Sequence, residues 1–90
     1  MASSKNFTRN PDVSWRTIEG QSVLVFNREG EIQVLNEVGT YVWEHMGESV
    51  EIMARGIASE YDVSEEEASR DVKAFLEELK GSGAILPAEE

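Results

Sequence analysis

The chain has 90 residues, of which 40% are hydrophobic, and this length allows one domain with a small core. It contains no cysteine, which excludes disulfides and thiolate metal sites. The formal net charge is −10, and residues 37–90 carry all of it, which argues against nucleic-acid binding because phosphate backbones need clustered Lys and Arg.

The first half of the chain predicts three strands joined by two glycine-containing hairpin turns. Residues 1–12 are polar and are expected to form a flexible tail. Apolar side chains alternate over residues 13–18, and residues 21–26 present apolar side chains to both faces. Sequential hairpins then place the third strand, residues 31–35, at one edge of an antiparallel sheet.

The second half of the chain predicts three helices. Asn36, Ser49 and Ser64 are typical N-cap residues, and each precedes a stretch with apolar residues at helical spacing. No helix can bury its apolar stripe alone, so the helices must cover one another and one sheet face. We therefore expect an α+β domain over residues 13–86, with a three-stranded antiparallel sheet followed by three helices, similar to a winged helix-turn-helix. Residues 87–90 would form a C-terminal tail.

Side chains that could catalyse a reaction or bind a metal are sparse. His45 is the one histidine of the chain and has no partners at a recognised metal spacing, and the serines lack a base-bearing motif. The glycines form no phosphate loop. No apolar run is long enough for a membrane span, and no signal segment follows the first residues. We therefore predict a cytoplasmic, non-catalytic protein without metal or cofactor that acts by binding.

The junction between the third strand and the first helix carries a family resemblance. Residues 35–44 read Leu-Asn-Glu-Val-Gly-Thr-Tyr-Val-Trp-Glu, which is similar to the L-N-x-x-[GA]-x-x-[IV]-W-E pattern of the PqqD family. The resemblance extends over roughly residues 13–86. It implies a peptide chaperone that binds the leader segment of a ribosomally made precursor peptide. The chaperone would present this leader to a modifying enzyme, often a radical S-adenosylmethionine maturase, as in PQQ biosynthesis.

An edge strand supports the same interpretation on physical grounds. Its unpaired N–H and C=O groups can accept an extended peptide as another strand. The resemblance places this peptide in a groove between the third strand and the third helix. The predicted peptide-binding residues are Glu31, Ile32, Gln33, Val34 and Leu35 on the strand and Arg70, Lys73, Ala74 and Glu77 on the helix. The sequence leaves open which face of the strand lines the groove, because Ile32 and Val34 are also suited to the core.

Two further pairs of residues have more than one interpretation. Arg70 and Lys73 share a helix face and could pair with acidic groups of a leader peptide, or within the helix with Glu66 and Glu77. Trp43 is expected to pack between helix and sheet. Trp15 is expected either in the core or at a self-association contact.

Other functions stay open at this point. The chain could be an interaction module with a different partner, or a homodimer formed through the free sheet edge. A winged-helix DNA binder is least favoured, because the third predicted helix has more acidic than basic residues.

Overall fold

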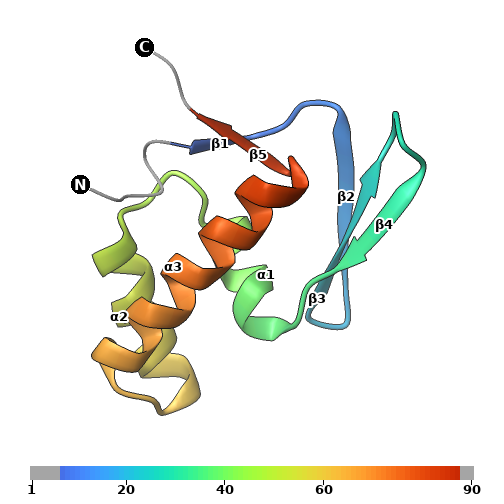
Figure 1. Ribbon diagram of the computed structural model, residues 1–90. Helices are drawn as coiled ribbons and strands as arrows, with labels where there is room; N and C mark the ends of the chain where they lie inside the picture. The colour runs from blue at the N-terminus through green and yellow to red at the C-terminus, as the bar shows by residue number, and fades with distance from the viewer. Residues whose placement is uncertain (1–6, 88–90) are drawn as a thin grey trace.

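The structure, a computed structural model, describes residues 7–87. Its elements are β1 (Phe7–Arg9), β2 (Val13–Ile18), β3 (Gln21–Phe26), β4 (Glu31–Val34), α1 (Glu37–Glu44), α2 (Val50–Tyr61), α3 (Glu65–Ser82) and β5 (Ile85–Pro87). The antiparallel sheet has the order β2-β3-β4, and β1 pairs antiparallel with β5. Figure 1 shows the three-stranded sheet beside the helices, with the β1–β5 ribbon near the C-terminal end of α3.

The predicted α+β fold is confirmed, with the three-stranded sheet preceding three helices. The three predicted N-caps also form, because each side-chain oxygen accepts a backbone N–H from the first helical turn. Asn36 accepts from Gly39 at 2.8 Å, and Ser49 and Ser64 accept equivalent bonds at 3.1 and 3.0 Å. α3 ends at Gly83, whose φ of 85° is a left-handed conformation that suits glycine.

The core lies between one face of the sheet and the helices. The largest fully buried apolar side chains are Trp43, Leu24, Met53, Ile57, Leu79, Ile85, Val42 and Val72. Thr40 ties α1 to the sheet, because its Oγ1 accepts from Ser22 N at 2.8 Å and donates to Leu35 O at 3.4 Å. The first turn of α1 is therefore fixed to the end of β4, and the predicted packing of Trp43 is confirmed.

The β1 strand corrects one prediction. Residues 7–9 were expected in a flexible tail, but they form the partner of β5. Arg9 also donates from Nε and Nη2 to Trp43 O at 3.1 and 2.8 Å, and from Nη2 to Glu44 O at 3.2 Å. Its guanidinium lies 5.0 Å from the centre of the Trp15 ring. The tail prediction is wrong here because a polar local sequence does not reveal a strand partner at the other end of the chain. Asn10, also in the predicted tail, donates from its N–H to Ala84 O at 2.9 Å, and Pro87, expected in the C-terminal tail, belongs to β5. The predicted tail residues 1–6 and 88–90 lie outside the described residues.

Trp15 lies at the rim of the core. Its ring packs edge-on against Trp43 with 5.8 Å between ring centroids, and the residue is 40% exposed.

Among residues 7–87, no helix combines the length and apolar character that crossing a membrane requires.

Candidate functional site

The free edge of β4 offers backbone groups to a partner. Leu35 N donates to Ser22 O at 2.8 Å, which places this pair in the hydrogen-bonded class of the β3–β4 ladder. Bonded and non-bonded pairs alternate in an antiparallel ladder, so Gln33 also bonds to β3. The N–H and C=O groups of Ile32 and Val34 consequently point away from the sheet. These two residues can form main-chain hydrogen bonds with an added strand.

The side chains of β4 divide between the two faces of the sheet. Gln33 is opposite the buried Leu24 in the strand register and therefore faces the helices, as the buried Leu35 does. Ile32 and Val34 are 66% and 57% exposed and point to the opposite face. The alternative that placed Ile32 and Val34 in the core is therefore wrong.

One side of α3 lies beside β4. Gln33 Nε2 donates to Glu78 Oε2 at 3.5 Å, which joins the strand to the helix. Phe75, three residues earlier, lies on the same side of α3 and packs against α1 at Gly39. A Cβ added to Gly39 would lie 2.6 Å from Phe75 Cε1, so glycine permits this close approach. We call the free edge of β4, together with Gln33, Phe75 and Glu78, the β4–α3 edge.

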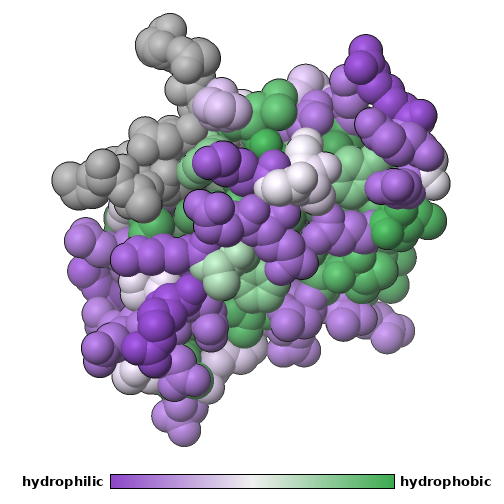
Figure 2. Space-filling view, in the orientation of Figure 1, coloured by the Kyte–Doolittle hydropathy of each residue, from purple (hydrophilic) through white to green (hydrophobic). Residues whose placement is uncertain are grey.

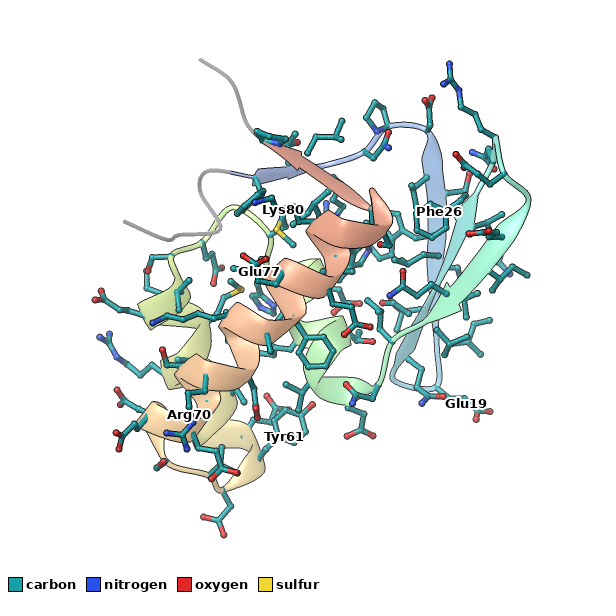
Figure 3. All side chains as sticks on the ribbon, in the orientation of Figure 1. Glu19, Phe26, Tyr61, Arg70, Glu77 and Lys80 are labelled. Atoms are coloured by element: carbon teal, nitrogen blue, oxygen red, sulfur yellow. The ribbon has the colours of Figure 1, made fainter. Side chains whose placement is uncertain are left out.

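The predicted helix residues are only partly beside β4. Ala74 lies about 40° around α3 from Glu78 and borders the β4–α3 edge. Arg70 lies about 80° from Glu78, whereas Lys73 lies about 140° and Glu77 about 100° from Glu78. Figure 3 shows Glu77 and Lys80 on the side of α3 that faces away from β4. The structure thus places Ala74 closest to β4 among the predicted helix residues, with Arg70 next to Ala74 and with Lys73 and Glu77 farther around the helix.

Sequence reasoning missed Glu78 and Phe75. Both flank the core stripe of α3, on the side opposite the predicted Lys73 and Glu77. Glu78 is four residues after Ala74, and this spacing on one face was the available signal.

The ion pairs expected within α3 are not formed. Across residues 7–87, Arg28 and Asp12, at 3.7 Å, make the one contact between opposite charges within 4.0 Å. Pairing of Arg70 with Glu66 and of Lys73 with Glu77 is therefore wrong as a description of this structure. All three basic residues of α3 are exposed to solvent.

A second concave surface lies on the far side of α1 from Phe75. The concavity has a volume of about 730 Å³ and is lined by Thr17, Gly20, Glu37, Thr40, Tyr41, Glu44, His45, Glu60 and Tyr61. Burial raises the pKa of Tyr41, and Glu48 and Glu60 raise it further. Burial likewise raises the pKa of Tyr61, with smaller contributions from Glu37, Glu60 and Tyr41. Both phenols are therefore protonated at neutral pH, and no three His, Cys, Asp or Glu side chains in the described chain are placed to hold a metal.

The outer face of the three-stranded sheet is apolar. Ile18 is 51% exposed on this face, which it shares with Ile32, Val34 and a concavity of about 350 Å³ lined mainly by β2 and β3. Figure 2 shows apolar surface gathered over the sheet. Exposed apolar patches of this kind are typical of contact surfaces.

Comparison with known proteins assigns the family. The family model described as coenzyme PQQ synthesis protein D (PqqD) matches residues 21–85. The chain belongs to the PqqD family. The PqqD match spans β3 to β5 and so includes every element of the β4–α3 edge. The family predicted from residues 35–44 is thereby confirmed.

Solved structures with the same fold as this PqqD-family chain include two proteins bound to peptides. A lasso peptide synthetase B1 complexed with the leader peptide is 31% identical, with a TM-score of 0.83 over 91% of this chain and 99% of that chain. TbiB1 in complex with the TbiA(beta) leader peptide is 24% identical, with a TM-score of 0.80 over 91% of this chain and 98% of that chain. The second likeness concerns the fold alone. No curated protein matches the chain.

Proposed function

We propose that this protein binds the leader segment of a ribosomally made precursor peptide as an additional strand on β4. The observation that carries the proposal is the free β4 edge, where Ile32 and Val34 leave their N–H and C=O groups unpaired beside α3. Main-chain hydrogen bonds would fix the register of the peptide, and side chains of α3 would select its sequence. The leader peptide held by a relative that is 31% identical supports this assignment.

The protein would present the bound leader to a modifying enzyme and would not itself catalyse the modification. Membership of the PqqD family and the peptide-bound relative support a recognition role. A radical S-adenosylmethionine maturase as the receiving enzyme and self-association through the sheet edge both stay predictions from the sequence.

The functional groups of the β4–α3 edge also favour recognition. The β4–α3 edge supplies backbone donors and acceptors, an amide, a carboxylate and an aromatic ring. Such groups can hold an extended peptide, and they include no nucleophile paired with a base.

Titration of the ¹⁵N-labelled protein with leader segments of precursor peptides encoded beside its gene tests the proposal. Amide shifts concentrated on Ile32 to Leu35 and on the Phe75–Glu78 side of α3 are expected. Shifts confined to the Tyr41 concavity or to the outer sheet face would contradict strand addition at β4. Shifts that depend on protein concentration and not on peptide would instead support a homodimer.

A further inference from the structure

The charges of α3 are separated across the helix. Asp71 and Glu78 are seven residues apart, so they lie within about 20° of each other on the side beside β4. Among the basic residues, Lys73 and Lys80 lie about 140° and 160° from Glu78, and Arg70 lies about 80° from it. The side of α3 that meets an added strand is therefore acidic.

The strand wall carries the same sign of charge. Glu31 is exposed and pairs in register with the buried Phe26, so its side chain is on the helix-facing side of β4, as is that of Gln33. No Lys or Arg belongs to β4, and the ion-pair distances in residues 7–87 give neither Glu31 nor Glu78 a basic partner. The present contact of the Glu78 carboxylate is the neutral amide of Gln33, at 3.5 Å. A cationic side chain in this position would form a charge-assisted hydrogen bond, which is stronger than a bond from a neutral amide.

An apolar contact follows at a defined distance along the same edge. The chain continues from Gln33 through Leu35 into α1, and Phe75 packs over Gly39 in the first turn of α1. Phe75 is only half-buried, so its ring has surface available to a ligand. Side chains two residues apart on a strand share a face and are separated by about 6.6 Å. A peptide that places one side chain at Glu78 therefore places the side chain two residues farther along near Phe75.

From this arrangement we infer that the recognised leader carries a Lys or Arg two residues from a large apolar residue, with both side chains directed toward α3. The basic side chain pairs with Glu78, and the apolar one packs on Phe75. This inference rests on the proposed strand addition and specifies the class of peptide. It differs from the expectation that Arg70 and Lys73 select an acidic leader, because the charged α3 residue in contact with β4 is Glu78.

Selection from randomised twelve-residue peptides displayed on mRNA tests the inference. The full chain and two charge-reversal variants, Glu78→Lys and Glu77→Lys, serve as targets. Glu77 and Glu78 are adjacent and exposed, so both variants change the net charge equally, but only Glu78 lies beside β4. The wild-type chain and Glu77→Lys should enrich Lys or Arg two residues from a Leu, Ile, Phe or Tyr. Glu78→Lys should lose this preference or favour Asp and Glu.

The selected peptide then gives a quantitative comparison. Replacing its basic residue with Glu should weaken binding about three- to tenfold, as expected for exposed charge pairs. The difference should fall below about twofold in 1 M salt, where the Debye length is about 3 Å. Equal affinity of the Lys and Glu peptides, or equal effects of Glu77→Lys and Glu78→Lys, would overturn the inference and leave strand addition intact. A selection whose peptides shift no amide of Ile32 or Val34 would instead overturn the proposed function.

Discussion

Proline at Val34 separates the peptide-binding role of β4 from its structural role. The Val34 N–H points away from β3, so Val34→Pro removes a donor that the native sheet does not use. Proline is tolerated at strand edges when the missing N–H faces solvent. The preceding residue, Gln33, already has the extended backbone that proline requires of its neighbour. We expect the stability of Val34→Pro to remain within about 1 kcal/mol of the wild type.

The loss of peptide binding should be much larger than the loss of stability. An added strand loses one main-chain hydrogen bond, which contributes about 0.5–1.5 kcal/mol, or roughly two- to thirteenfold in affinity. The proline ring also occupies the space in which that strand must lie. The dissociation constant should therefore rise at least about tenfold. Fluorescence anisotropy of a labelled leader peptide measures this constant, and urea denaturation followed by circular dichroism measures stability.

Two control variants make this test specific. Val34→Thr keeps the N–H and changes only a side chain on the outer sheet face, so its affinity should remain within about twofold of the wild type. Gln33→Pro removes an N–H from the pair with Leu24, so it should destabilise the fold by about 1–3 kcal/mol. A folded Val34→Pro variant that binds the leader as tightly as the wild type would refute strand addition at β4.

Three further predictions concern the scaffold. Gly56→Ala places a methyl group against the Tyr41 side chain and should lower the free energy of unfolding by about 1–3 kcal/mol. Gly81→Ala, in open space, should raise it by about 0.5–1 kcal/mol. Similar urea midpoints for the two variants would contradict this packing. Arg9→Ala removes charged hydrogen bonds to the end of α1 and should lower the free energy of unfolding by about 1.5–3 kcal/mol. Arg9→Lys should restore little of this stability. Unchanged thermal melting would show that β1 is not anchored in this way. In the folded protein the pKa values of Tyr41 and Tyr61 are raised above the ordinary value of 10.0. The stability that depends on their protonated phenols is therefore fully present below about pH 10 and is lost as pH rises through the pKa values of the folded state. Melting temperatures should therefore fall above about pH 10, less steeply in Tyr41→Phe, and a flat profile would contradict the shifts.

The sequence predicted the local structure well because its determinants are local. Hairpin glycines, the N-caps Asn36, Ser49 and Ser64, and apolar spacing each act within a few residues. These signals located the three-stranded sheet and the three helices and identified β4 as an edge. Their agreement over most of the chain is also what made the family pattern recognisable.

The candidate site was harder to predict because it depends on which way each element faces. A strand with an apolar residue on each face does not reveal its buried side, so the exposure of Ile32 and Val34 required the structure. A helix has two flanks beside its core stripe, and helical spacing alone does not say which one meets the sheet. The prediction from sequence named Arg70, Lys73, Ala74 and Glu77. It included Ala74, which borders β4, but it left out Phe75 and Glu78, which lie on the side of α3 beside β4.

The sequence by itself determined that this is a small acidic α+β domain of the PqqD family with a strand free at the sheet edge. Tertiary structure decided that β1 closes onto β5 through contacts between the chain ends, and that the helix surface beside β4 is acidic and not basic. Both decisions arise from packing between distant segments, which sets the rotation of α3 about its axis. Local sequence signals determine that α3 forms, but only its neighbours determine the side it presents to a ligand.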